Sequence, residues 1–144
     1  MNQAIKQLSM IAFALVFMTG AAFAQNASTL SQTGDDNDVT IVQAYQSGVS
    51  SAVNEAFVVQ DGDDNEIVRL AQAGAGNLYD VLQDGNDNLV TRNPNQGTSS
   101  RPSFNGIIDI DQVGNSNRVW DTDQTGDGNE LYLTQQGDGN FADF

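Results

Sequence analysis

The sequence predicts an all-β protein, a two-sheet β-solenoid with cross-β stacking, built from about five coils of about 23 residues each. Three observations predict this fold. A six-residue motif, Gln-x-Gly-x-x-Asn, recurs along most of the chain, and the segments between its copies alternate apolar and polar residues. The copies also follow one another at a nearly constant spacing, and a fixed period indicates stacked structural units.

The motif is too frequent to arise by accident. Gln, Gly and Asn each make up about a tenth of the chain, so about 0.14 chance matches are expected over its length. Seven copies occur, beginning at Gln32, Gln60, Gln72, Gln83, Gln112, Gln124 and Gln135. Successive copies start 12 and then 11 residues apart from Gln60 to Gln83, and again from Gln112 to Gln135, so two half-repeats span 23 residues.

Each half-repeat contains one predicted strand, which joins the Asn of one motif to the Gln of the next. The clearest example is Asn-Leu-Tyr-Asp-Val-Leu-Gln at residues 77–83, where Asn, the two alternate apolar residues and Gln share one parity. Residues 37–43 and 129–135 repeat this pattern. Side chains two residues apart lie on the same face of a strand, so all four are expected to point inward.

The Gly-x-x part of each motif predicts a corner between strands. Gly, Asn and Asp tolerate the positive φ angles of tight turns. The predicted turn glycines are Gly34, Gly62, Gly74, Gly85, Gly114, Gly126 and Gly137. One strand and one corner form a half-repeat, two half-repeats form a flat coil, and successive coils are expected to stack about 4.7–4.8 Å apart.

Inward-facing amides are expected to form ladders, because identical side chains stacked in register satisfy one another's hydrogen bonds. Solvated loop residues would not share the parity of the apolar positions. The predicted amyloid ladder comprises Gln32, Asn37, Gln43, Asn54, Gln60, Asn65, Gln72, Asn77, Gln83, Asn88, Asn105, Gln112, Asn117, Gln124, Asn129, Gln135 and Asn140.

Two enlarged corners interrupt the period. After Gln43 the next Asn of matching parity is Asn54, so residues 44–53 replace a four-residue corner. Residues 93–104 contain both prolines of the chain, which cannot donate to a ladder, so a strand is expected to end near Asn95 and the pattern to resume at Asn105. Successive corners are expected to fall on the two edges of the solenoid in turn, and counting along the chain places both enlarged corners on the same edge.

The opposite edge is predicted to be acidic. It receives Asp35, Asp36, Asp61, Asp63, Asp64, Asp84, Asp87 and Asp138. Carboxylates one strand spacing apart repel by roughly 0.9 kcal/mol even at the dielectric constant of water, so this edge is expected to slow premature assembly.

Residues 1–24 are predicted to be a signal peptide, and residues 25–144 the repeat domain. Lys6 precedes an apolar run, and Ala22-Phe-Ala24 places small residues where a signal peptidase cleaves. A membrane anchor is the alternative, but the apolar run falls short of the roughly 20 residues that a span requires.

Composition disfavours several classes of function. From Gln25 onward the chain has four arginines against 19 acidic residues, which disfavours nucleic-acid binding and association with anionic membranes. It has no Cys and no His, so it lacks disulfides, the commonest general base and a principal zinc ligand. No catalytic residue, metal site or cofactor is expected.

The repeated Gln-x-Gly-x-x-Asn, with alternating apolar positions before the next Gln, resembles curlin, the subunit of curli amyloid fibres of bacterial biofilms. The resemblance covers essentially all of the chain after Ala24. It implies a homopolymeric extracellular fibre for adhesion and aggregation, export through the periplasm and a dedicated outer-membrane secretion pore, and growth from a minor nucleator subunit.

This chain departs from the curlin pattern at its beginning. Only about seven residues separate Ala24 from Gln32, whereas curlins carry a longer Gly-rich segment there that addresses the secretion pore. The last repeat, 135–140, fits the motif cleanly, which favours the major subunit over the nucleator, whose last repeat is divergent and basic.

Other classes fit the residues less well. Gly126-Asp-Gly-Asn129 suggests a calcium-binding β-roll, but β-rolls repeat every nine residues with an inward Asp, and here the period is 11 to 12 with Asp in corners. An EF-hand from Asp121 would have Tyr132 where Glu is required. An ice- or carbohydrate-binding solenoid needs a regular outer face, and the outward positions here are mixed and charged.

Overall fold

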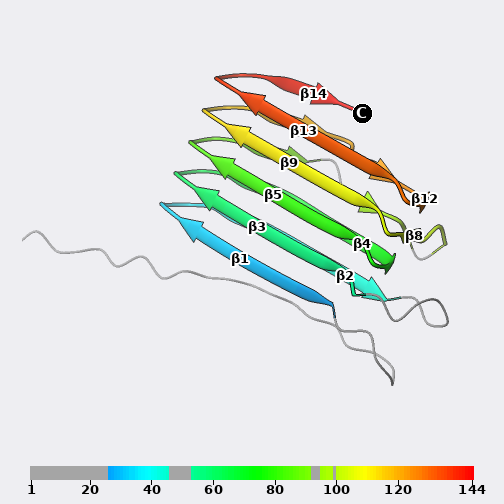
Figure 1. Cartoon of the computed structure of the whole chain (residues 1–144). Coiled ribbons are helices and arrows are strands. Elements are labelled where there is room, and N and C mark those ends of the chain that lie inside the picture. Colours follow the sequence, from blue (N-terminus) through cyan, green and yellow to red (C-terminus); the bar gives the residue numbers. More distant parts are fainter. Residues whose placement is uncertain (1–25, 46–52, 92–94, 99) are drawn as a thin grey trace, which may run out of the picture.

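The computed structural model describes residues 26–45, 53–91, 95–98 and 100–144. Over these residues the chain is all-β, with strands stacked in parallel one above another and no helix (Figure 1). The described part therefore offers no helix that is long and apolar enough to cross a membrane. The predicted signal peptide and parts of both enlarged corners, 44–53 and 93–104, lie outside the described residues.

Five strands of equal length form one sheet, which we call the regular sheet. In sheet order it comprises β1 (Ala27–Thr33), β3 (Glu55–Asp61), β5 (Leu78–Asp84), β9 (Ile107–Val113) and β13 (Glu130–Gln136). All neighbours are parallel, and the register has no shift from β1 to β13. Equal residue spacing between Asn and Gln positions explains this regularity, because each strand presents the same parity to its neighbours.

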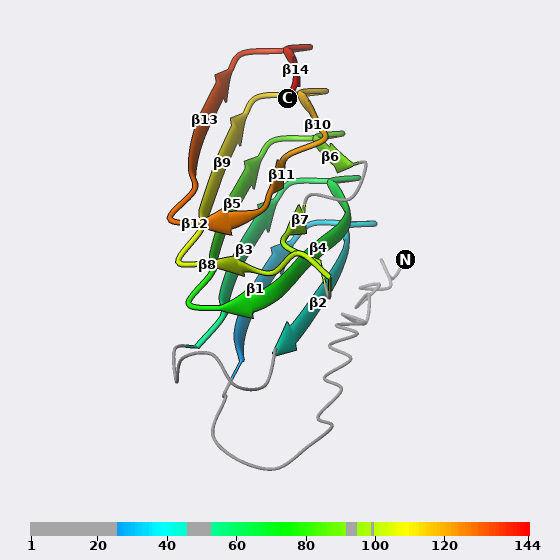
Figure 2. The same ribbon diagram turned by 90° about the vertical axis from the view of Figure 1, so that its right-hand side faces the viewer.

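The remaining strands form a second sheet, which we call the interrupted sheet. It comprises β2 (Asp38–Tyr45), β4 (Glu66–Ala75), β6 (Leu89–Thr91), β7 (Asn95–Gln96), β8 (Ser103–Phe104), β10 (Arg118–Trp120), β11 (Asp123–Gln124), β12 (Gly126–Asp127) and β14 (Phe141–Asp143). Its pairings are also parallel, and the chain passes alternately between the two sheets (Figure 2).

The parity predicted for Asn and Gln fails in two segments of the interrupted sheet, from Asn65 to Gln72 and from Asn117 to Gln124. Asn65 precedes Gln72 by seven residues rather than six, and both side chains are nonetheless buried. Val68 and Arg69 are exposed in succession, and the pairing of β2 with β4 shifts register after Val39. The extra residue is thus accommodated as a bulge, which returns Gln72 to the inner face.

Positive φ angles make the corners. All seven predicted turn glycines have φ between 96° and 129°. On the acidic edge a second left-handed residue follows two positions later, for example Asp64 after Gly62 and Asp87 after Gly85, both at 57°. Two left-handed residues so close together reverse the chain within a few residues, which carries it from one sheet to the other.

The hydrophobic core draws on both sheets. The regular sheet contributes Ala56, Val58, Tyr79, Val81, Ile108 and Ile110, and the interrupted sheet contributes Ile67, Leu70, Val90 and Val119. Each of these side chains is at most 1% exposed. Their burial is the main favourable contribution to folding, and it holds the amide positions at either end of each strand in fixed register.

Candidate functional site, the stacked amide columns

A continuous column of glutamines runs through the regular sheet. Each Nε2 donates to the Oε1 of the next glutamine toward the C-terminus: Gln32 to Gln60 at 2.7 Å, Gln60 to Gln83 at 2.8 Å, Gln83 to Gln112 at 2.9 Å and Gln112 to Gln135 at 3.0 Å. Gln60 Nε2 also donates to the backbone oxygens of Asp38 and Asn65. Burial of these amides is tolerated because their donors and acceptors are paired.

A second glutamine column runs through the interrupted sheet. Gln43 donates to Gln72 at 2.8 Å, Gln72 to Gln96 at 3.0 Å, and Gln96 to Gln124 at 3.5 Å. Gln96 is fully buried, although the sequence predicted that its strand ends near Asn95 and left Gln96 out of the ladder. That prediction was wrong because Gln96 follows Asn88 by eight residues, two more than the regular interval of six. The even distance keeps Gln96 on the inner face, so parity counted from Asn88 was a signal for it.

One asparagine column lies beside the acidic edge. It contains Asn37, Asn65, Asn88, Asn117 and Asn140. Each backbone N–H donates to the Oδ1 of the preceding asparagine at 3.0–3.1 Å. Three of the side-chain amides also reach the next corner, since Nδ2 of Asn37, Asn65 and Asn88 donates to the carbonyl of Gly62, Gly85 and Gly114, respectively, at 2.7–2.8 Å. This column therefore ties strands and corners together.

The other asparagine column corrects one predicted ladder residue. Asn77 donates its N–H to Asn54 Oδ1, and the N–H of Gly106, rather than that of Asn105, donates to Asn77 Oδ1 at 3.1 Å. Asn105 is exposed, with φ of 56°. Gly106 occupies the ladder position because it precedes Gln112 by the regular six residues, whereas Asn105 precedes it by seven.

The asparagine column that contains Asn54 and Asn77 extends to Asn26 at its N-terminal end and to Asn129 at its C-terminal end. Asn54 Nδ2 donates to Asn26 Oδ1 at 3.3 Å, so Asn26 is a ladder residue, although it belongs to no copy of the Gln-x-Gly-x-x-Asn motif. Its six-residue distance from Gln32 was the available signal. At the other end Asn129 is half-buried, and its Nδ2 donates to the Thr125 carbonyl at 2.8 Å.

A further column, which we call the corner column, lies on the acidic edge. The residue after each corner glycine donates its N–H to the Oδ1 of its counterpart in the next corner: Asp35 to Asp63, Asp63 to Asn86, Asn86 to Asn115 and Asn115 to Asp138, at 2.7–3.0 Å. The sequence-based prediction treated the three aspartates only as repelling charges and did not include Asn86 and Asn115. The signal was that this position is Asp or Asn in all five corners.

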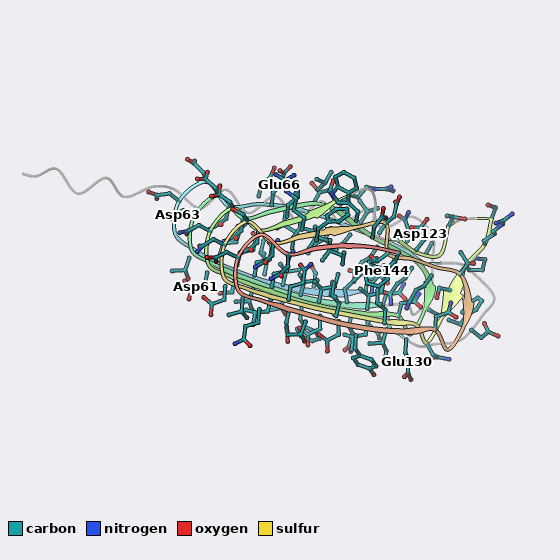
Figure 3. The ribbon with its side chains drawn as sticks, turned by 90° about the horizontal axis from the view of Figure 1, so that it is seen from above. Asp61, Asp63, Glu66, Asp123, Glu130 and Phe144 are labelled. Atoms are coloured by element: carbon teal, nitrogen blue, oxygen red, sulfur yellow. The ribbon has the colours of Figure 1, made fainter. Side chains whose placement is uncertain are left out.

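The other predicted acidic-corner residues project from the same edge. Asp36, Asp64 and Asp87 are exposed and have positive φ, and Asp61 pairs in register with Asp84. Figure 3 shows Asp61 and Asp63 together at this edge, far from Asp123. The edge thus combines paired corner carboxylates with solvated ones.

The outer face of the regular sheet carries a separate carboxylate group. Asp80 on β5 lies in register with Asp109 on β9, and Asp111 follows two residues later. Desolvation, followed by the negative charge of Asp80, raises the pKa of Asp109; desolvation, followed by Asp109, raises the pKa of Asp111. Inside the core, burial raises the pKa of Tyr79 well above its ordinary value.

Asp109→Asn is expected to stabilise the fold at pH 7. A carboxyl whose folded-state pKa is raised favours folding below its unfolded pKa and loses that contribution as pH rises through the folded value. The stability difference between Asp109→Asn and the parent chain should therefore be largest at neutral pH and vanish near pH 4. Urea denaturation at several pH values measures it, with the exposed Asp127→Asn as control; equal pH dependence of the two variants would contradict the assignment.

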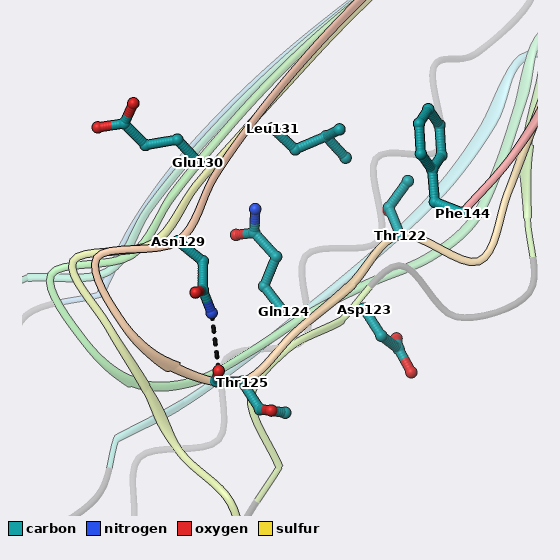
Figure 4. A pocket seen from close by; sticks show the side chains of 8 residues that line it. All are labelled: Thr122, Asp123, Gln124, Thr125, Asn129, Glu130, Leu131 and Phe144. Carbon is teal, nitrogen blue, oxygen red and sulfur yellow. Dashed lines mark hydrogen bonds between the residues drawn. The ribbon is translucent and has the colours of Figure 1, made fainter.

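A hollow of about 440 Å³ opens at the C-terminal end of the interrupted sheet (Figure 4). Its lining comprises Thr122, Asp123, Gln124, Thr125, Asn129, Glu130, Leu131 and Phe144. It lies over β11, which is the edge of its sheet. The glutamine column of that sheet therefore ends at Gln124 within the described residues.

The described side chains are organised as stacked amides within the chain. Within the described ranges, no group of three or more Asp and Glu is placed to hold a metal ion. The features that recur from strand to strand are instead hydrogen-bonded amide columns that run the length of the molecule. Comparisons with protein-family models, with curated proteins and with solved structures gave no match.

Proposed function

We propose that the chain is a structural subunit of an extracellular amyloid fibre similar to curli, and that its two sheets form a β-solenoid whose coils stack end to end between copies. The glutamine column of the regular sheet carries this proposal. Its four successive hydrogen bonds repeat one geometry from Gln32 to Gln135. A further copy would add the same rung, because stacked identical amides extend indefinitely along a cross-β axis.

Both ends of the regular sheet support addition of further copies. β1 and β13 are its edge strands, and each presents unpaired backbone groups that favour pairing with another strand. The inward residues of β1 include Leu30 and Gln32, and those of β13 include Leu131, Leu133 and Gln135. The two edges thus carry the same apolar and amide chemistry, so the C-terminal edge of one copy suits the N-terminal edge of another.

The biological setting of the proposal comes from the curlin resemblance. We infer that residues 1–24 direct export, that the chain leaves through an outer-membrane secretion pore, and that it serves as a major subunit in biofilm adhesion, with growth started by a nucleator. The absence of Cys suits passage of an unfolded chain. No catalytic step or cofactor enters this function.

Polymerisation of the chain from Gln25 onward tests the proposal. Electron microscopy after a day of incubation should show unbranched fibres, and fibre diffraction should show a meridional reflection near 4.7–4.8 Å. The same incubation with a calcium chelator should give the same fibres, whereas a β-roll would then fail to fold. A chain that stays a dispersed monomer without that reflection would refute the function.

A further inference from the structure

The corner column has a direction. In the first four corners of the acidic edge the backbone N–H donates toward the C-terminal end, and in the last four the side-chain Oδ1 accepts from the N-terminal side. Four such hydrogen bonds link the five corners from Asp35 to Asp138. Each hydrogen bond joins one corner to the corner stacked next to it, and all four point the same way. The column therefore has a direction along the stacking axis.

The two ends of this column are complementary. At the C-terminal end the Asp138 carboxylate accepts from the N–H and Nδ2 of Asn115, at 2.8 and 3.1 Å, but no described residue accepts the N–H of Asp138. At the N-terminal end Asp35 donates its N–H to Asp63, while no described residue donates to the Asp35 carboxylate. One end offers a donor and the other an acceptor.

We propose that the N–H of Asp138 donates to Asp35 Oδ1 of a second copy, and that this contact fixes the polarity and register of the junction between copies. The inference rests on the end-to-end stacking proposed above. Two C-terminal ends would face each other with two donors, and two N-terminal ends with two carboxylates. Head-to-tail docking alone continues the pattern, and it brings Gln135 opposite Gln32 in the same step.

The same contact makes the junction sensitive to charge. Inside one copy Asn86 and Asn115 separate Asp63 from Asp138 in the column. Across the junction Asp138, Asp35 and Asp63 would follow one another directly, three carboxylates at successive steps of about 4.8 Å. Their mutual repulsion opposes docking at neutral pH and low salt. The junction is therefore the step at which charge controls growth of the fibre.

Asp138→Asn is expected to strengthen the junction. Its Oδ1 would still accept from Asn115, and its new Nδ2 would donate to Asp35 of the next copy, as Asn115 Nδ2 donates to Asp138 within the chain. One carboxylate repulsion is removed and one hydrogen bond is added. The concentration of soluble chain that coexists with fibres should fall roughly fivefold to tenfold at low salt, and less at high salt.

Asp36→Asn is the matched control. It removes the same charge from the same edge, and Asn tolerates the φ of 56° there, but Asp36 shares its corner position with Gly139 and lies outside the corner column. Its effect should stay within about twofold, because Asp36 is exposed to solvent, where salt screens its charge, and its counterpart across the junction, Gly139, carries no side chain. Asp35→Asn removes the same repulsion across the junction, but its new Nδ2 would face Asp63 of its own copy, so it should lower the soluble concentration in the same direction by a smaller factor. It serves if Asp138→Asn folds poorly.

Three outcomes separate the ideas. Fibres of Asp138→Asn or Asp35→Asn with a markedly lower residual soluble concentration than Asp36→Asn support the junction contact. Equal values for all three variants, from a parent chain that forms cross-β fibres, overturn the contact and leave the proposed function standing. A parent chain that forms no fibres overturns both.

Discussion

Gly85→Ala is expected to prevent folding of the column and formation of fibres. Gly85 has φ of 121°, a conformation that residues with a side chain rarely adopt, and an added Cβ would overlap the carbonyl group of Gly114 in the next corner. That group is backbone and is hydrogen-bonded to Asn88 Nδ2, so it cannot move aside without disrupting a ladder. Strain and overlap together should cost at least about 3 kcal/mol, a large part of the stability of a small domain.

Gly128→Ala provides the control for this substitution. Gly128 also has positive φ, at 65°, but nothing lies within 4 Å of an added Cβ. It should cost about 1 kcal/mol, the usual penalty for a side chain in the left-handed region. Circular dichroism and thioflavin fluorescence of both variants measure the difference. Fibres from Gly85→Ala at the parent rate would show that the corners do not stack as described.

The regular sheet could be predicted from sequence because one rule governs all its strands. Asn54 to Gln60, Asn77 to Gln83 and Asn129 to Gln135 are each six residues apart, so parity alone assigns which side chains face inward. The same six-residue distance separates Asn26 from Gln32 and Gly106 from Gln112, so all five strands of the regular sheet follow the rule. Strict spacing within one sheet thus carries enough information to fix both its register and its buried amides.

The interrupted sheet could not be predicted in the same way. Its Asn-to-Gln distances are six, seven, eight and seven residues, and the extra residues are absorbed by bulges and strand breaks that a parity rule does not contain. The corner column was missed for a different reason. The sequence shows only that the position is Asp or Asn in all five corners, whereas the hydrogen bonds depend on the φ angles of two corner residues and on stacking between successive corners.

Gln83→Glu is expected to destabilise the column and the fibre about as strongly as Gly85→Ala, because it introduces a charge into the centre of the glutamine column. Gln83 is fully buried, accepts from Gln60 at 2.8 Å and donates to Gln112 Oε1 at 2.9 Å. A carboxylate keeps the first hydrogen bond, but it loses the second and places negative charge against the Gln112 oxygen. Loss of about 3 kcal/mol corresponds to a roughly hundredfold rise in the soluble concentration that coexists with fibres.

The pH dependence of Gln83→Glu shows whether its defect comes from the lost hydrogen-bond donor and the added charge or from a change in side-chain packing. When protonated, the new carboxyl regains one O–H donor for Gln112 and carries no charge, so its folded-state pKa should lie above its unfolded value. Stability should then return as pH falls toward 4, with the sign opposite to that of a salt-bridged carboxylate. Gln136→Glu makes the same change at the exposed neighbour of Gln135 and should show no such recovery. A Gln83→Glu chain that assembles like Gln136→Glu at pH 7 would mean that the buried amide column does not hold the fibre together.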